Sequence, residues 1–360
     1  APQTLGTPGQ NLRPMTGRPS SRAGALRTLR IHGMGAAGAL AAAGAFLLLA
    51  ACQQAPLHSG AAPQVRFQAE EARGLLHVLL ANQPVLTYVY GSEWDLPHFY
   101  PLYSPSGQSM TVQKTEPYPH HRSFWFADTV QLAGHRAASF YNALYTGQGN
   151  PKDPRPPFRD RIRHRQFVLQ QPGRGQGRLH WELVWEMDHG RIPVLEESRQ
   201  MRVVALGRGE YFLDLTFTVT ARYGPVTFLS DAAHYAWPYV RLNDRFNTNG
   251  LGRLVNSAGG IGQAGTHEQV ARWVDFSRTG IPEAEGLALL SHPANPHPHT
   301  WLTRDYGTFG PRREAARHGK RFTLPQGDSL QMRVGVLVHR GDVTTGRVAE
   351  RYHAWCENRL

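Results

Sequence analysis

The chain has 360 residues, of which 41% are hydrophobic and 10% aromatic, and its formal net charge is +12 at pH 7. This composition excludes an intrinsically disordered chain, because it supplies enough apolar area for a large core. The basic residues are scattered and form no Lys/Arg run, so the charge does not indicate a nucleic-acid partner.

The N-terminal part has the layout of a secretory signal. Residues 35–51 form an uncharged apolar run, and only arginines charge the segment ahead of it (Arg13, Arg18, Arg22, Arg27 and Arg30). A positive region, an apolar region and small residues before a cleavage site are typical of a signal peptide. Leu49-Ala50-Ala51-Cys52 resembles a lipobox, in which the cysteine thiol takes a lipid. A transmembrane anchor is the alternative, but the run is shorter than the ~20 residues that span a bilayer.

We therefore predict three parts: a signal peptide with an upstream extension (1–51), a lipidated cysteine with a flexible tether (52–63), and a single folded domain (64–360). The domain is expected to be exported and anchored in the cell envelope by the lipid on Cys52. We expect it in the outer membrane, facing the periplasm or the cell surface, with that lipid as its only membrane contact.

Beyond residue 64 the dominant pattern is period-two alternation, which indicates strands with one face on a core. It is clearest in 179–187, 211–219 and 330–338, where apolar residues recur at every second position. Shorter candidate strands lie near 75–80, 84–90, 123–127, 162–169, 199–206, 270–276 and 286–291. Only 343–356 looks helical, with Asp342 or Thr344 as its cap.

Many strands without interleaved helices predict a mainly β domain, a large antiparallel β-sandwich with few helices. We expect it to resemble the supersandwich of galactose mutarotase-like proteins. Trp181 and Trp185 follow the alternation and are expected in the core, as is Trp125.

The alternation breaks in two polar, Pro-rich regions, and these carry the candidate site. The first region contains His120-His121-Arg122, in which an imidazole could move protons near neutral pH and the guanidinium could bind substrate oxygens. We take His120 and His121 as catalytic candidates and Arg122 as a substrate-binding candidate. The alternative is that Arg122 pairs with a buried acid and that the histidines cap loops. Tyr100, in the same region, could stack on a sugar ring.

The second region contains Arg304-Asp305-Tyr306. Asp305 could act as a general base, Tyr306 could donate a hydrogen bond, and Arg304 could hold substrate. The alternative is a structural Arg–Asp pair. Asn295 is a further substrate-binding candidate, and we expect the two regions to meet at one mouth of the sandwich.

Neither a metal nor a cofactor is expected. His297 and His299 could face one side of a strand, but each follows a proline and no further ligand completes a metal-binding set. Cys52 and Cys356 are the only cysteines, too few for a Cys-based zinc site. The Gly-rich segment 250–265 lacks the GxGxxG spacing of a dinucleotide site.

Four stretches also carry a family resemblance: PHFYPLYSPSG, PHHRSFWFA, WVDF and SHPANPHPHTWLTRDYG. Over residues 74–340 the chain resembles the bacterial PmoA-like family of unknown function, often labelled "methane oxygenase PmoA". The resemblance implies an exported β protein, often found beside sugar-metabolism genes. A true methane monooxygenase subunit is not expected, because no apolar run after Cys52 is long enough to span a bilayer.

The resulting hypothesis is a carbohydrate-active enzyme of the epimerase, hydrolase or lyase type. A histidine would act as acid and base, Asp305 would be its partner, and arginines would hold oxygens of a carbohydrate ligand. Two alternatives remain: a non-catalytic glycan-binding lipoprotein and an envelope-interaction protein. Catalysis predicts that five residues share a cleft: His120, His121, Arg122, Arg304 and Asp305.

Overall fold

The computed structural model describes residues 62–147, 150, 152–229, 236–295, 299–312 and 321–360. These residues belong to one compact unit, Ser59–Leu360. The predicted signal peptide, Cys52 and the metal-ligand candidate His297 lie outside the described residues.

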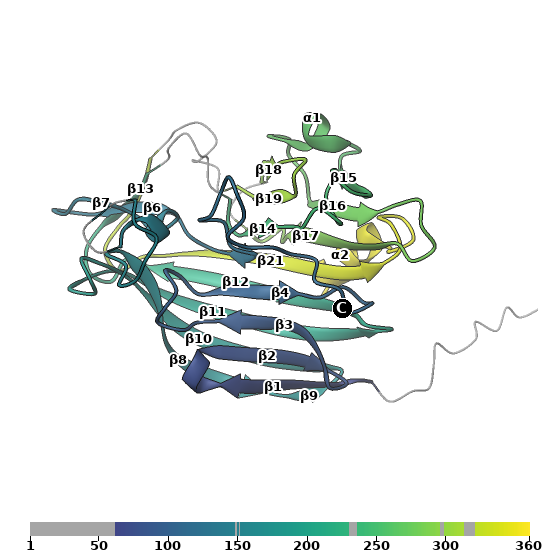
Figure 1. Cartoon of the computed structure of the whole chain (residues 1–360), viewed down its shortest axis with the longest axis horizontal. Helices are drawn as coiled ribbons and strands as arrows, with labels where there is room; N and C mark the ends of the chain where they lie inside the picture. The colour runs from purple at the N-terminus through teal and green to yellow at the C-terminus, as the bar shows by residue number, and fades with distance from the viewer. Residues whose placement is uncertain (1–61, 148–149, 151, 230–235, 296–298, 313–320) are drawn as a thin grey trace, which may run out of the picture. The chain divides into compact units, whose positions relative to one another are not determined.

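Two large sheets and one small sheet make up this unit, and every strand pair in them is antiparallel among the described residues (Figure 1). The nine-stranded sheet runs in the order β18 (Trp301–Thr303), β19 (Thr308–Pro311), β14 (Tyr239–Arg241), β5 (Phe124–Trp125), β4 (His98–Leu102), β3 (Gln83–Val89), β2 (Leu75–Leu80), β1 (Gln64–Glu70), β9 (Gly173–Arg174). The eight-stranded sheet runs in the order β15 (Gly252–Asn256), β16 (Trp273–Arg278), β17 (Glu285–Ser291), β21 (Ser329–Arg340), β12 (Glu210–Thr220), β11 (Ile192–Gly207), β10 (Gln176–Met187), β8 (Arg161–Gln171). The small sheet contains β20 (Phe322–Leu324), β13 (Val226–Phe228), β6 (Thr129–Leu132), β7 (Ala137–Ser139).

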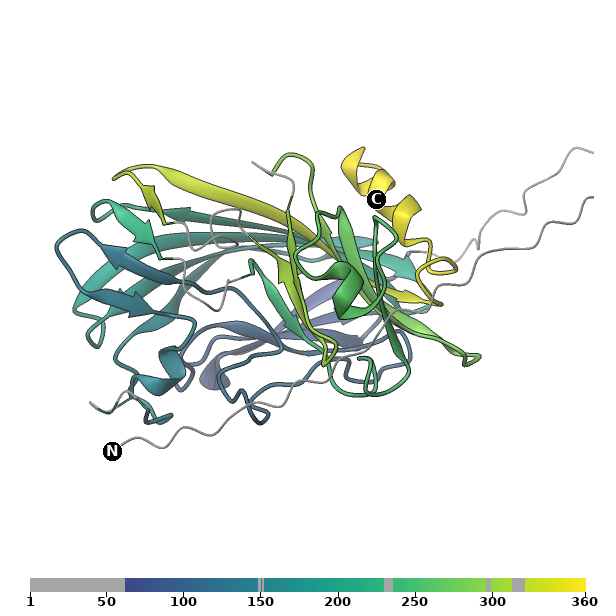
Figure 2. The same ribbon diagram turned by 90° about the horizontal axis from the view of Figure 1, so that it is seen from above.

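The main core lies between the two large sheets, and period-two alternation builds it. In β12 the residues Leu213 and Leu215 are fully buried, and they lie opposite Val336 and Val334 of β21. Figures 1 and 2 show the two sheets facing each other across this core. Burying one face of each sheet removes a large apolar area from water, which stabilises the pair of sheets. The predicted antiparallel β-sandwich is confirmed.

The predicted burial of three tryptophans is confirmed, since Trp125, Trp181 and Trp185 are at most 1% exposed. Trp181 and Trp185 are buried between the two large sheets, whereas Trp125 is buried on the outer side of the nine-stranded sheet. The longest predicted strands correspond to β10, β12 and β21, and the shorter prediction at 75–80 coincides with β2.

The helix α2 (Val348–Cys356) packs on one part of the outer face of the eight-stranded sheet, as Figure 2 shows. Phe212 points to this face because it lies between the core residues Tyr211 and Leu213. Its ring packs on Trp355, with a centroid distance of 5.5 Å. The helix begins later than the predicted 343–356, because Asp342 instead forms a turn with the backbone N–H groups of residues 344 and 345.

Several strands are absent from the sequence prediction, above all β4, β14, β18 and β19 of the nine-stranded sheet. In β19 all four residues are buried, so no alternation between exposed and buried positions marks it. The Gly-rich segment likewise contains β15 and the short helix α1 (Gly262–Thr266).

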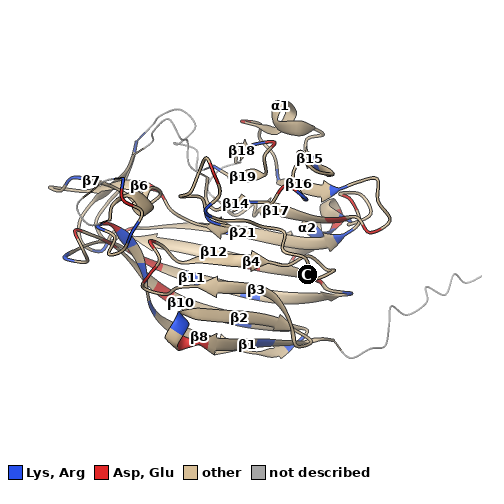
Figure 3. Ribbon diagram, in the orientation of Figure 1, with Lys and Arg blue, Asp and Glu red and all other residues tan. Residues whose placement is uncertain are grey.

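Basic and acidic residues are distributed over both sheets and their connecting loops (Figure 3). No helix in the described ranges is both long and apolar enough to cross a membrane. Two single turns of 3-10 helix, η1 (Glu71–Arg73) and η2 (Ala143–Tyr145), complete the secondary structure.

Candidate functional site

The outer face of the nine-stranded sheet carries a row of polar and aromatic side chains. Trp125 lies opposite His98 on one side and Tyr239 on the other. Directly opposed residues in antiparallel strands share a face. The neighbouring residue Phe99 packs on Trp181 of the other sheet and therefore faces the core. His98, Trp125 and Tyr239 consequently lie on the outer face, where the last two stack at 4.7 Å.

The segment before β5 folds over this row and brings the two predicted regions together. The His121 ring lies 5.4 Å from Trp125, and Tyr118 stacks on His121 at 4.8 Å. Tyr118 also stacks on Tyr306, with ring centroids 5.6 Å apart. Two stretches almost two hundred residues apart in sequence therefore meet, because β5 and β19 both pair with β14. We call the resulting group the histidine–tyrosine cluster; its members are Tyr118, His120, His121, Tyr141, Tyr145 and Tyr306.

Each histidine of the cluster has a tyrosine hydroxyl as its partner. Nδ1 of His120 lies 3.0 Å from the Tyr145 hydroxyl, and Nε2 of His121 lies 3.1 Å from the Tyr141 hydroxyl. Burial, reinforced by the positive charge of Arg122, lowers the pKa of His120 to about 4. Burial, reinforced by its histidine and arginine neighbours, lowers the pKa of His121 to about 3. Both imidazoles are therefore neutral at pH 7 in this structure.

Arg122 is fully buried and forms an ion pair with the equally buried Asp95. Its Nη1 donates to the carbonyl oxygen of Pro119 at 3.1 Å. These bonds hold the turn that presents the two histidines, so the arrangement matches the alternative in which Arg122 pairs with a buried acid. The residue positions the candidate site without exposing its guanidinium to a ligand.

Asp305 is exposed, and its carboxylate turns toward α1. Oδ1 accepts a hydrogen bond from the backbone N–H of Gln263 at 2.9 Å. Arg304 donates to Nε2 of His267 at 2.8 Å. Within the described residues neither an Arg304–Asp305 ion pair nor a contact between Asp305 and the two histidines is present. The predicted His/Asp acid–base pairing is therefore not what the geometry forms.

Arg241 lies in the middle of the outer face and was missed by the sequence analysis. Its guanidinium carbon lies 4.3 Å from the centre of the Tyr306 ring. Nη1 donates to the carbonyl oxygen of Tyr306 at 2.5 Å, and burial lowers the pKa of the guanidinium. Nothing in the sequence around Arg241 distinguishes it from other arginines in strands. Tyr118, by contrast, belongs to the same polar region as the histidines and could have been included.

Tyr100 lies on the same outer face, in a pocket of about 700 Å³ next to the cluster. Trp94 and Tyr103 also line this pocket. The Lys114 ammonium lies 4.0 Å from the centre of the Trp94 ring, and the Arg122 guanidinium lies 5.6 Å from it. Trp94 therefore lies between the aromatic pocket and the turn that carries the histidines.

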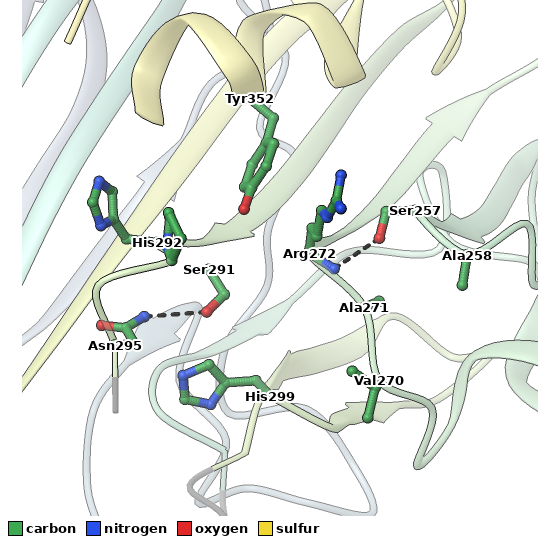
Figure 4. Close-up of a pocket in the computed structure, with 11 residues that line it drawn as sticks. Ser257, Ala258, Val270, Ala271, Arg272, Ser291, His292, Asn295, His299 and Tyr352 are labelled. Carbon is green, nitrogen blue, oxygen red and sulfur yellow. Dashed lines mark hydrogen bonds between the residues drawn. The ribbon is translucent and has the colours of Figure 1, made fainter. Parts of the chain in front are cut away.

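Asn295 lies in a different pocket, of about 660 Å³, beside α2 (Figure 4). Its side-chain nitrogen donates to Oγ of Ser291 and to the carbonyl oxygen of Arg333, and its oxygen accepts from the Arg333 N–H. Both ends of the amide are thus occupied in holding the loop after β17. The structure does not bring Asn295 together with the histidine–tyrosine cluster.

In the described part of the chain, no three His, Cys, Asp or Glu side chains are grouped so that they could hold a metal ion. His299, one of the two ligand candidates, is buried, and its Nδ1 lies 2.7 Å from the carbonyl oxygen of Arg312.

Two facing antiparallel sheets define the chain as a β-sandwich protein. More particularly, it belongs to the family described as "Family of unknown function (DUF6807)", whose model matches residues 76–353. The expected PmoA-like family is therefore wrong, because the family match is to this other family. Short His-, Pro- and aromatic-rich stretches were not specific enough to identify a family. No protein with a curated description matches the sequence.

Solved structures of low similarity include the GH36 α-galactosidase AgaB from Geobacillus stearothermophilus, with a TM-score of 0.43 and 10% identity over 77% of this chain and 41% of that one. An α-galactosidase from Lactobacillus brevis has a TM-score of 0.40 and 9% identity over 77% and 41% of the two chains. A polysaccharide lyase has a TM-score of 0.34 and 13% identity over 79% of this chain and 34% of that one. The chain spans about two fifths of the length of these α-galactosidases. All three TM-scores are too low to support a functional argument.

Proposed function

We propose that the outer face of the nine-stranded sheet binds a carbohydrate and that His120 and His121 exchange protons with it. The observation that carries this proposal is the pair of adjacent neutral imidazoles, each bonded to a tyrosine hydroxyl. Imidazoles and phenols both donate and accept hydrogen bonds, as sugar hydroxyl groups do. A cluster of such groups is therefore matched to a polyhydroxylated ligand.

The two histidines have different access to a ligand. His120 is half-buried, whereas His121 is buried beneath the ring of Tyr118. We assign direct contact with the carbohydrate to His120 and place His121 behind it, in ring contact at 4.7 Å. A neutral imidazole can accept a proton, and it does so more readily when negative charge develops beside it.

A second candidate function is non-catalytic glycan binding at the pocket that contains Tyr100. Trp94, Tyr100 and Tyr103 line this pocket together with polar side chains such as Gln113. Aromatic rings pack on the apolar faces of sugars while polar groups bind their hydroxyls. In this function the histidine–tyrosine cluster would be structural.

Both functions can be tested by incubating the purified full chain with an oligosaccharide library and measuring binding and products by mass spectrometry. Catalysis predicts that His120→Gln and His121→Gln retain binding but lose most turnover. Glycan binding alone predicts no product and a loss of binding in Tyr100→Ala. Asp305→Asn is the matched comparison, and full turnover is expected because this carboxylate binds the backbone at α1. If no saccharide is bound or altered, both functions are wrong.

We also propose that the chain is a lipoprotein exported to the cell envelope. The proposal rests on the apolar run 35–51, the arginines before it and the Leu49-Ala50-Ala51-Cys52 motif. Expression with a radiolabelled fatty acid is expected to label the wild type but not Cys52→Ser, and membrane fractionation is expected to release the variant. Equal labelling of both proteins would contradict the assignment.

A further inference from the structure

Arg241 differs from every other buried arginine in the described part of the chain. Four arginines are buried there. Three of them form an ion pair with a carboxylate: Arg122 with Asp95, Arg199 with Glu197, and Arg312 with Glu268. Arg241, only 7% exposed, forms no ion pair with any described residue.

One edge of its guanidinium is also without hydrogen bonds. Nη1 donates to the carbonyl oxygen of Tyr306 and, at 3.4 Å, to the Thr308 hydroxyl. Nε is buried and has no partner. Nη2 likewise makes no hydrogen bond to the described residues. The Nε–Nη2 edge therefore remains available for a further acceptor.

The surroundings of Arg241 contain no ion-paired acid among the described residues. Tyr118, His121 and Tyr306 lie around it, and His121 is neutral at pH 7. The Asp244 carboxylate raises the pKa of Arg241 without forming an ion pair with it, and this carboxylate accepts hydrogen bonds from two asparagine side chains. A guanidinium removed from water without a counter-charge is costly, and such groups concentrate at functional sites.

We propose that Arg241 binds the carboxylate of an acidic sugar, such as a uronate unit of an oligosaccharide. This inference rests on the proposed carbohydrate function and names its substrate class. The planar fork of arginine matches a carboxylate, which can accept from Nε and Nη2 together. Nε is buried in this structure, so binding of a carboxylate there requires a movement of the side chains around Arg241, among which Tyr118 is 36% exposed.

Binding of a carboxylate here also bears on the histidines. The positive charge of Arg241 is one of the causes that lower the pKa of His121. A bound carboxylate neutralises that charge and raises the pKa of His121 toward the range in which an imidazole exchanges protons. The acidic substrate thereby makes His121 more basic, although burial and His120 still lower its pKa, and His121 lies in ring contact with His120, which contacts the ligand.

The test uses isothermal titration calorimetry on the full chain with three pairs of oligosaccharides. In each pair, one oligosaccharide is built from an acidic sugar and the other from its neutral counterpart. The pairs are glucuronate and glucose, galacturonate and galactose, and mannuronate and mannose. At least one acidic member is expected to bind about tenfold or more tightly than its neutral partner, as for a charge-assisted bidentate contact.

Three variants test whether Arg241 causes the preference for acidic oligosaccharides. Arg241→Met is expected to abolish it, and Arg241→Lys to retain only part of it, because lysine keeps the charge but loses the fork. Arg245→Met is the control, since Arg245 is an exposed arginine four residues away that bonds Gln108. Circular dichroism checks folding, and Arg241→Lys decides the question if Arg241→Met does not fold.

The outcomes separate the two proposals. An unchanged acid preference in Arg241→Met and Arg241→Lys, or equal binding of acidic and neutral partners by the wild type, overturns the carboxylate assignment alone. So does binding of a neutral saccharide from the wider library when no acidic one binds. If nothing in either set binds, the carbohydrate function fails and this inference fails with it.

Discussion

Two buried arginines, one on each large sheet, occupy different electrostatic settings. On the eight-stranded sheet, Arg199 and Glu197 form an ion pair inside the sandwich, and the Trp185 indole donates to the same carboxylate at 2.6 Å. On the outer face of the nine-stranded sheet, Arg241 has only a carbonyl oxygen, a hydroxyl group and an aromatic ring as partners. The charge of Arg199 is compensated within the fold by Glu197. The charge of Arg241 has no such partner and could be compensated by a ligand.

The largest expected effect is on the compensated pair. Glu197→Gln leaves the Arg199 guanidinium buried without its counter-charge, and we expect it to reduce the free energy of unfolding by about 3–5 kcal/mol. Chemical denaturation followed by fluorescence measures this change. Glu196→Gln, at the adjacent and more exposed position, is the control and is expected to cost less than ~1 kcal/mol. If both variants lose the same free energy of unfolding, burial does not determine how much these ion pairs contribute to stability.

For each unit of pH, a smaller effect is expected from acid, through histidines on the outer face. Burial lowers the pKa of His98 and of His121 to about 3. As the pH falls below about 6.5, the ordinary histidine value, the unfolded chain binds protons that the folded chain does not, so stability decreases. The decrease approaches about 1.4 kcal/mol per pH unit for each such histidine, down to its folded pKa.

His121→Gln removes one of these sites, so its unfolding free energy should depend less steeply on pH between 6 and 4 than that of the wild type. Denaturation at a series of pH values measures the two slopes. His353→Gln, at an exposed position on α2, should keep the wild-type slope. A His121→Gln slope identical to the wild type would mean that His121 binds its proton in the folded state.

The smallest effect is expected at Arg241. Arg241→Leu loses the hydrogen bond to the Tyr306 carbonyl but also removes an uncompensated buried charge, and these contributions oppose each other. We expect the free energy of unfolding without ligand to change by less than about 1 kcal/mol. Thermal denaturation of the two proteins measures it. A loss comparable to that of Glu197→Gln would make Arg241 a structural residue and end the contrast between the two sheets.

Strands with one covered face were predictable, and strands with two covered faces were not. β10 and β12 alternate over much of their length because one side of each faces the core and the other is less buried, and β21 does so in its first half. β4 and β19 show no such alternation, because segments from elsewhere in the chain cover their outer side. The histidines were recognisable by their clustering in sequence. Arg241 was not, because a single arginine in a strand has no local signature of an unfilled site.

The antiparallel sandwich could be predicted from the sequence, because period-two alternation is a local pattern that requires one dry face on each strand. Which charges meet depends instead on the tertiary fold. Asp95 reaches Arg122 through the fold, the Asp305 carboxylate turns to α1, and Arg241 is left without an acid among the described residues. Strand register and burial set these outcomes, and both depend on segments that are distant along the chain.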